Sequence, residues 1–224
     1  MRLILIRHGQ TSSNVHDLLD TGAPGADLTA LGREQAAAVP RSLGDEDIDL
    51  IYASNLVRTQ QTAAPLIEQR GLELRVRPGL REVSAGDLEM RGDEVSHRAY
   101  LGAIFGWAKD PAVRVPGAES GAEVWRRYDD VVAEAHAAGV STAVMFSHGA
   151  VIRSWCAARV ENVTGEHAAY NPITNTGAVV LEGSPRDGWW AHLWEGKPLG
   201  GDRLDAVGSD GPAGEKAPPA TSTP

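Results

Sequence analysis

The segment LILIRHG, residues 3–9, decides the fold of this chain. Its apolar residues are unbroken, which is typical of a strand buried on both faces of a sheet. Two similar apolar runs follow at 50–53 and 143–146, and weaker ones lie at 74–76 and 178–181. Helical patterns separate these runs. Strands that alternate with helices predict an α/β fold with a mainly parallel sheet covered on both faces.

The clearest helix pattern spans Ser120 to His136. Ser120 and Glu123 have the spacing of a capping box, apolar residues then recur at helical spacing, and Gly139 follows as a stop signal. Three further helices are predicted to begin near Thr29, after Asn55 and after Gly149. Pro40 should end or bend the first of these three, because proline cannot donate the helical hydrogen bond.

The 224 residues suffice for one sizeable domain or two small ones. Of the last 20 residues, 205–224, 15 are Gly, Pro, Ala, Ser or Thr. Such a segment has little to bury, so we expect a flexible Gly/Pro/Ala-rich tail there and a folded unit over 1–204. Cys156 is the only cysteine, which excludes an intrachain disulfide and fits a reducing compartment.

Composition and charge narrow the class of function. Hydrophobic residues make up 42% and charged residues 23%, which is ordinary for a globular protein. The net charge of −9 argues against a nucleic-acid partner or an acidic membrane surface. A phosphate ligand would therefore need a local cluster of basic groups. No apolar stretch reaches the length of a membrane span, so we expect a cytoplasmic protein.

Polar side chains follow the apolar runs, where a parallel sheet binds its ligands. Arg7 and His8 follow the first run, Arg58 lies soon after the second, and His148 follows the third. Glu82 comes after one of the weaker runs. We expect these five side chains to meet at one edge of the sheet.

This combination of residue types suits phosphoryl transfer. Arginine offers planar paired donors for phosphate oxygens. A neutral imidazole can attack phosphorus, a protonated one can neutralise charge, and a carboxylic acid can protonate a leaving oxygen and then deprotonate water. One histidine must then be neutral and the other charged, and their neighbours must enforce the difference. The set does not resemble a metal site.

The motifs around these residues resemble the histidine phosphatase superfamily, in its phosphoglycerate-mutase-like branch. The resemblance covers almost the whole folded unit in the family's order: LILIRHGQTSSN (3–14), LTALGREQA (28–36), YASNLVRTQQTA (52–63), GLRE (79–82), PGAES (116–120), FSHG (146–149) and NTG (175–177). It implies a three-layer α/β/α sandwich with a variable cap at about 90–116. It also implies a phosphohistidine intermediate with no metal or cofactor.

The resemblance assigns a role to each matching position. His8 would be the nucleophile and Glu82 the proton donor and acceptor. The groups that hold the phosphoryl group would be Arg7, Arg58 and His148. Lesser contacts to the substrate would come from Asn14, Thr11 and Gly149.

Simpler interpretations of several residues stay open. Arg58 can pair with a surface acid, Asn14 can cap a turn, and Thr11 can cap the first helix. Asp87 and Glu89 lie close enough to Glu82 to share its role. His16 is a minor candidate for the site. The apolar segment 100–107 either packs the domain or presents an apolar wall to a substrate or partner.

The sequence favours a phosphatase over a mutase. Mutases of this family carry a paired-arginine segment after the catalytic glutamate, whereas 90–116 holds only single arginines. The Arg126-Arg127 pair lies on the predicted long helix instead. A phosphomutase and a non-catalytic phosphate-binding module remain the alternatives. The partner would be a small phosphorylated metabolite. Its identity stays open, because residues 86–90, which border the substrate, depart from the family pattern. A homodimer is also possible.

Overall fold

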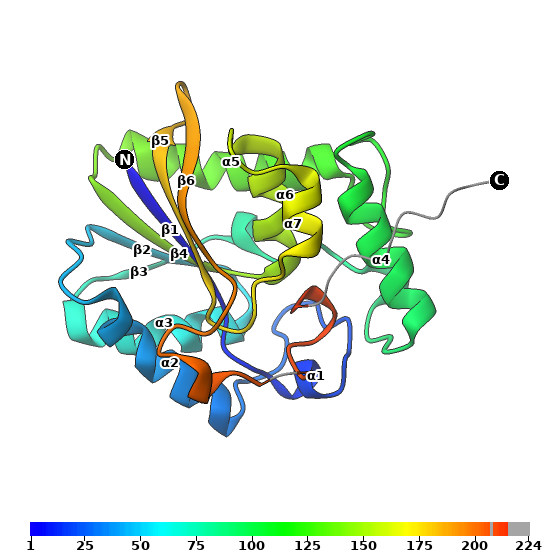
Figure 1. The fold of residues 1–224 in the computed structure, drawn as a ribbon, viewed down its shortest axis with the longest axis horizontal. Helices are drawn as coiled ribbons and strands as arrows, with labels where there is room; N and C mark the ends of the chain where they lie inside the picture. Colours follow the sequence, from blue (N-terminus) through cyan, green and yellow to red (C-terminus); the bar gives the residue numbers. More distant parts are fainter. Residues whose placement is uncertain (207, 215–224) are drawn as a thin grey trace.

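The computed structural model describes residues 1–206 and 208–214. Its centre is a six-stranded sheet in the order β3-β2-β4-β1-β5-β6 (Figure 1). The strands are β1 (Arg2–Arg7), β2 (Leu50–Ala53), β3 (Leu74–Val76), β4 (Thr142–Ser147), β5 (Ala178–Ser184) and β6 (Gly188–Glu195). The first four run parallel, and β5 and β6 add an antiparallel pair at one side. The predicted mainly parallel sheet is confirmed, and β6 is the strand that no apolar run had indicated.

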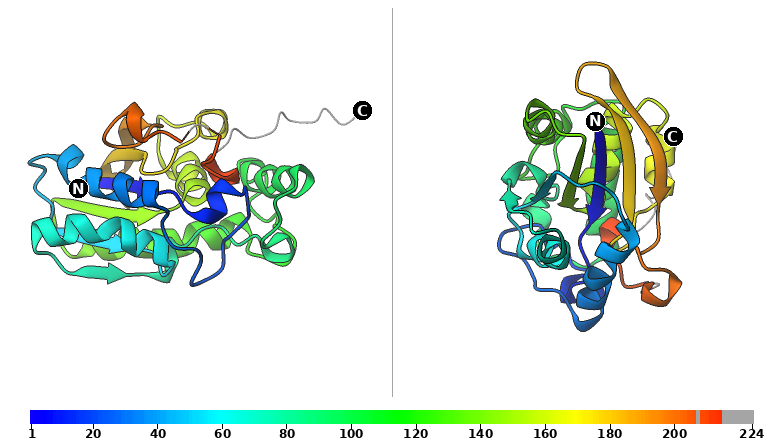
Figure 2. Two further views of the ribbon diagram at one scale, coloured as in Figure 1. Left: turned by 90° about the horizontal axis from the view of Figure 1, so that it is seen from below. Right: turned by 90° about the vertical axis from the view of Figure 1, so that its left-hand side faces the viewer.

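Helices cover both faces of the sheet (Figures 1 and 2). They are α1 (Ser12–Val15), α2 (Ala30–Leu43), α3 (Val57–Arg70), α4 (Glu94–Gly106), α5 (Gly121–Ala137), α6 (Gly149–Arg159) and α7 (Gly165–Tyr170). Four short 3₁₀ turns are η1 (Pro78–Leu80), η2 (Gly86–Leu88), η3 (Asp202–Leu204) and η4 (Pro212–Gly214). None of the described helices is long and apolar enough to cross a membrane.

Local signals set the helix ends largely as predicted. The Ser120 hydroxyl accepts from the Glu123 backbone N–H at 3.4 Å, and the Glu123 carboxylate accepts from the Ser120 N–H at 2.9 Å, so the capping box forms. α2 differs, because it continues three residues past Pro40 to Leu43. Val39 and Pro40 are both buried there, and this packing offsets the hydrogen bond that proline cannot make.

Two apolar cores hold the three layers together. Leu3 and Leu5 belong to the core on the side of α5 and α6, whereas Ile4 and Ile6 belong to the core on the side of α2 and α3. Successive side chains of a strand point to opposite faces, so an unbroken apolar run in β1 supplies both cores. The three-layer α/β/α architecture is confirmed.

The strand register places the candidate residues at one edge. Arg7 pairs with Ser147 at the carboxyl ends of β1 and β4. The His8 backbone N–H donates to the Ser147 carbonyl at 3.0 Å, which extends the ladder by one bond. His8 and His148 therefore leave the sheet side by side.

Two segments outside the sheet pack near this edge. α4 falls in the expected cap and buries Tyr100, Leu101 and Ile104, so the apolar segment 100–107 packs against the domain. The expected tail from Asp205 divides into two parts. Within 208–214, Asp210, Pro212 and Ala213 contact the site and are described below, whereas 207 and 215–224 lie outside the described residues.

Candidate active site

A small cavity of about 30 Å³ opens at the carboxyl edge of the sheet. Five of the predicted site residues line it: Arg7, His8, Asn14, Arg58 and Glu82. They come from segments that are far apart in the sequence, and the alignment of the strand ends brings them together. The cavity also has walls that the sequence did not indicate, from 18–21 and 212–213, and one from Tyr100, in the segment 100–107 that was a candidate wall.

His8 is buried and its ring is oriented by its own loop. Nδ1 lies 2.8 Å from the Gly9 carbonyl, so a neutral ring that donates there leaves Nε2 with a free lone pair. Burial, and after it the charges of Arg58 and Arg7, hold the pKa of His8 well below its usual range. A neutral imidazole with one fixed nitrogen is the form that can act as a nucleophile.

His148 lies next to His8, with the ring centroids 5.1 Å apart. Its Nε2 contacts the Ser54 hydroxyl at 2.8 Å, and Nδ1 has no hydrogen-bond partner among the described residues. Burial lowers the pKa of His148 well below its usual range, and Arg58 and His8 lower it further. The expected division into one neutral and one charged ring is therefore not produced by these neighbours.

Arg7 and Arg58 bring buried positive charge to the cavity, with 1% and 3% of their surfaces exposed. Arg7 donates to the carbonyls of Ile173, at 2.8 Å, and Asp210. Arg58 lies in the first turn of α3, and donates to the Asp20 carbonyl at 2.8 Å. Its nearest carboxylate, that of Asp20, is 3.9 Å away and is buried with it, so this is not a surface pair.

Three guanidinium nitrogens at the cavity have no hydrogen-bond partner within the described chain. They are Nε of Arg7 and both Nε and Nη1 of Arg58. A buried donor left without a partner costs about 1–3 kcal/mol, so such groups are rare unless a ligand uses them. Planar donors of this kind match the oxygens of a phosphoryl group.

Glu82 projects its carboxylate onto the first turn of α6. Oε1 accepts from the backbone N–H groups of Val83 at 2.9 Å and Val151 at 2.8 Å, and Oε2 accepts from Ala150 at 3.1 Å. α6 begins at Gly149, directly after His148. The carboxylate is thereby held at the cavity that His8 also lines.

Asp87 and Glu89, the alternatives to Glu82, do not line the cavity. The Glu89 carboxylate accepts from the N–H groups of Thr21 and Gly22 at 2.8 and 2.9 Å and is engaged in holding that loop. The exposed Asp87 lies against Gly117. Glu82 is the carboxylate of these three that reaches the site.

The turn before Glu82 is held by Arg127 of α5. Its guanidinium donates to the carbonyls of Gly79, Arg81 and Glu82 at 2.7, 2.8 and 3.1 Å, and its Nε pairs with Glu119 at 3.0 Å. The sequence placed Arg127 on a helix without a role in the site. Its position, three residues after Val124 on the buried face, was the signal that pointed inward.

Asn14, Thr11 and Gly149 have structural duties at the site. Thr11 caps α1, because its hydroxyl accepts from the Asn14 N–H at 3.2 Å while the Asn14 side-chain oxygen accepts from the Thr11 N–H at 3.0 Å. Asn14 still lines the cavity. A Cβ on Gly149 would lie 2.8 Å from the Ala213 carbonyl oxygen and 3.2 Å from Arg7 Nε, so glycine permits this close approach.

The segment 208–214 closes one side of the cavity. The Asp210 side chain accepts from the Asn175 N–H at 2.9 Å, and its backbone carbonyl accepts from Arg7. Burial raises the pKa of the Asp210 carboxyl. Pro212 and Ala213 form part of the wall. The composition of this segment, with little to bury, gave no signal for these contacts.

Tyr100 closes another side of the cavity from the cap. Its hydroxyl donates to the Val83 carbonyl at 2.7 Å. Burial, and then the charges of Glu82 and Glu89, raise the pKa of Tyr100 well above its usual range, so the phenol stays protonated. α4 therefore contributes a polar group to the site besides its apolar packing.

The sequence profile of the histidine phosphatase superfamily (branch 1) matches residues 3–196. The PE-PGRS family protein PE_PGRS11 of Mycobacterium tuberculosis is 34% identical over 212 residues, in a match that covers 87% of this chain and 36% of the relative. The chain thus corresponds to a minor part of that protein's length.

Two further kinds of relative bear on the chemistry. Glucosyl-3-phosphoglycerate phosphatase of Mycobacterium tuberculosis is 31% identical over 191 residues, covering 81% of this chain and 85% of the relative. A solved structure of the mycobacterial enzyme with VO3 superposes with a TM-score of 0.73 at 31% sequence identity. The match covers 87% of this chain and 98% of the chain in that structure. A 2,3-bisphosphoglycerate-dependent phosphoglycerate mutase of Bartonella tribocorum is 32% identical over 174 residues, in a match that covers 73% of this chain and 83% of the relative.

Proposed function

Because the chain belongs to the histidine phosphatase superfamily, we propose that it is a metal-independent phosphatase that hydrolyses small phosphomonoesters through a phosphohistidine at His8. One observation carries the proposal. The buried N–H donors of Arg7 and Arg58 that lack a hydrogen-bond partner in the described chain belong to side chains that line the same cavity as a neutral imidazole. Together they supply a nucleophile and the positive charge that a phosphoryl group requires.

In the first step, the phosphoryl group is held by Arg7 and Arg58, and Nε2 of His8 attacks phosphorus. The P–N bond forms as the bond from phosphorus to the leaving oxygen breaks. Protonated Glu82 transfers its proton to that oxygen, so a neutral alcohol departs. Positioning and charge stabilisation account for most of the rate.

In the second step, water attacks the phosphohistidine. The Glu82 carboxylate takes a proton from the water as the P–N bond breaks, which returns His8 to its neutral form and releases inorganic phosphate.

His148 has a different role, which is to neutralise charge on the phosphoryl group. A phosphoryl dianion beside His148 favours the protonated form of its ring. The positive charge that the neighbouring protein groups disfavour is therefore stabilised once the substrate binds.

The alternative function is a phosphomutase, which the mutase relatives support. A mutase must grip a second anionic group of its substrate while the phosphohistidine waits. In this chain Arg127 is committed to backbone carbonyls and Arg126 is exposed on α5. The pair is thus not presented to the cavity, which favours transfer to water.

A panel of phosphomonoesters tests the proposed function. The purified chain is expected to release inorganic phosphate from several alkyl phosphates, with the dephosphorylated alcohol as the other product. Recovery of an isomeric phosphate ester instead would establish the mutase. Absence of both products across the panel would support a non-catalytic phosphate-binding module.

Glu82→Gln tests the proton transfer. Turnover of an alkyl phosphate is expected to fall about 10²-fold or more, because an alkoxide leaves poorly without a proton. Turnover of p-nitrophenyl phosphate should fall much less, because nitrophenolate leaves unaided. Steady-state rates with both esters give the comparison, and Asp87→Asn is the matched control. Equal losses for the two esters would remove Glu82 from the acid role.

We further propose that the protein acts in the cytoplasm on a small phosphorylated metabolite. Cys156 is a free, buried thiol, which a reducing compartment preserves. A homodimer stays a prediction of the sequence.

A further inference from the structure

A larger hollow of about 720 Å³ adjoins the catalytic cavity. Thr21 lines both, and Arg81, which lines the hollow, directly precedes Glu82, which lines the cavity. An ester whose phosphoryl group lies against His8 therefore projects its leaving group over Thr21 into the hollow. The volume is within the range of small-molecule sites.

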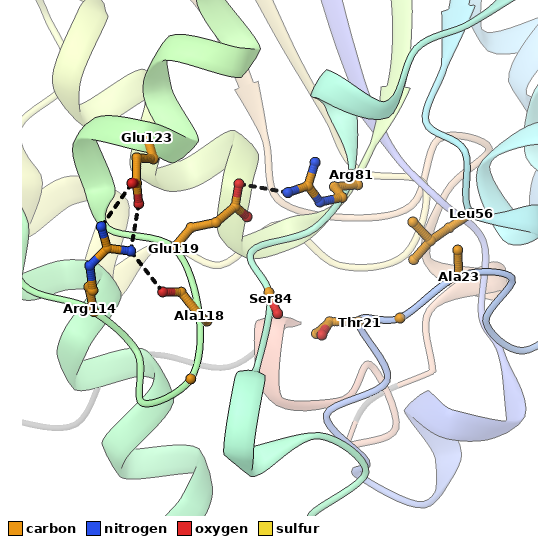
Figure 3. Close-up of a pocket in the computed structure, with 11 residues that line it drawn as sticks. Thr21, Ala23, Leu56, Arg81, Ser84, Arg114, Ala118, Glu119 and Glu123 are labelled. Atoms are coloured by element: carbon orange, nitrogen blue, oxygen red, sulfur yellow. Dashed lines mark hydrogen bonds and ion pairs between the residues drawn. The ribbon is translucent and has the colours of Figure 1, made fainter.

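Two ion pairs form one wall of the hollow. Arg81 pairs with Glu119 at 2.7 Å, and Arg114 pairs with Glu123 at 2.7 Å. Figure 3 shows Arg114 with Glu123 on the side opposite Ala23 and Leu56, and Arg81 between Leu56 and Glu119, extended toward Glu119. Glu119 also pairs with Arg127, which is not among the lining residues. The charged side chains that do line the hollow are two arginines and two glutamates, so the lining itself offers no net positive charge to a second anionic group.

Paired charges of this kind suit hydroxyl groups. A hydroxyl can donate to a carboxylate oxygen while it accepts from a guanidinium N–H. Ser84 adds a hydroxyl on the floor of the hollow that can still donate to a substrate oxygen. The Thr21 hydroxyl beside it already donates to the Glu89 carboxylate and accepts from the Ala85 N–H. No aromatic side chain is among the described residues that line the hollow, so these residues supply no platform on which a nucleobase could stack.

We infer that the hollow is the leaving-group site for an uncharged, hydroxyl-rich alcohol, so that the preferred substrate is a sugar or polyol phosphate. The inference rests on the proposed phosphatase activity and extends it to a class of substrate. It assigns the recognition of hydroxyl groups to Arg81 with Glu119 and to Arg114 with Glu123.

The test compares kcat/KM of the full chain for four alkyl esters: glucose 6-phosphate, butyl phosphate, 3-phosphoglycerate and adenosine 5′-monophosphate. Glucose 6-phosphate is expected to be the best substrate. In Arg81→Met, and separately in Arg114→Met, the ratio of kcat/KM for glucose 6-phosphate to kcat/KM for butyl phosphate should fall about tenfold. A tenfold fall is what the loss of one charge-assisted hydrogen bond would cause. Arg159→Met, which removes a comparable pair with Asp129 outside the hollow, is the control and should leave the ratio unchanged.

Each other outcome overturns the inference in its own way. A preference for 3-phosphoglycerate would show that the hollow binds an anion, and a preference for the nucleotide would show that it binds a base. Equal losses for glucose 6-phosphate and butyl phosphate in both variants would mean that the arginines do not contact the leaving group. If no ester is hydrolysed and no phosphate is bound covalently, the proposed phosphatase fails before its substrate class is in question.

Discussion

His8→Ala is expected to lower kcat by at least about 10³-fold and to abolish covalent labelling by substrate phosphate. The variant lacks the nitrogen that forms the P–N bond, and the neighbouring His148 is held by Ser54 with its ring tilted 59° to His8. A second nucleophile is therefore not in position to replace it. Rapid quenching in base, followed by measurement of acid-labile phosphate on the protein, checks the intermediate.

His16→Ala is the matched control for this experiment. His16 is the histidine nearest to His8 in the sequence, but it is exposed and contacts the Ser12 carbonyl at 2.8 Å. Its replacement should leave both turnover and labelling close to those of the unmodified chain. If His8→Ala retains turnover, or if His16→Ala loses labelling, the assignment of the nucleophile is wrong.

Arg58→Met is expected to lower kcat/KM by about 10²–10³-fold, because it removes two buried donors that have no hydrogen-bond partner in the described chain. It should also move the acidic limb of the pH profile. The Arg58 charge lowers the pKa of His8, so its removal raises that pKa. The ring then becomes protonated at a higher pH, and activity is lost earlier as the pH falls. Kinetics across the pH range measure both effects.

Arg70→Met is the corresponding control, since Arg70 lies at the other end of the same helix. Its activity and pH profile should stay close to those of the unmodified chain. A drop in rate for Arg58→Met with an unshifted acidic limb would mean that Arg58 is too weakly coupled to His8 to set its protonation. Thermal unfolding of both variants separates these effects from loss of the fold.

Local patterns were sufficient to predict most of the fold. Apolar runs indicated five of the six described strands, and the reason is clearest for β1, β2 and β4, because a strand buried on both faces needs unbroken hydrophobicity. The short β3 contains Arg75 and is only partly buried, so its signal was weaker. β6 lacked this signal, since it lies at the edge of the sheet and exposes Trp190 and Leu193. Pro40 gave a misleading signal, because burial of the surrounding turn outweighs one missing hydrogen bond.

The site was predictable where it follows from the sheet and not where it depends on tertiary packing. Arg7, His8, Arg58 and Glu82 were found because strand ends converge. Arg127 and Tyr100 act through backbone carbonyls that come near only after the helices dock. The contacts of 208–214 depend on main-chain groups and on Asp210, and neither composition nor periodicity reports such bonds.

The shared register of β1 and β4 bears on how this protein can change over evolutionary time. The two histidines are placed by the ladder of backbone hydrogen bonds, so a slip of one residue would part them. The walls of the larger hollow come instead from the loop around Thr21, the turn after Glu82 and the segment that leads into α5. Substitutions in those segments can alter which ester is accepted without breaking a bond of the ladder. Different segments of the chain thus determine the reaction and the specificity, so a new specificity can arise while the reaction is conserved.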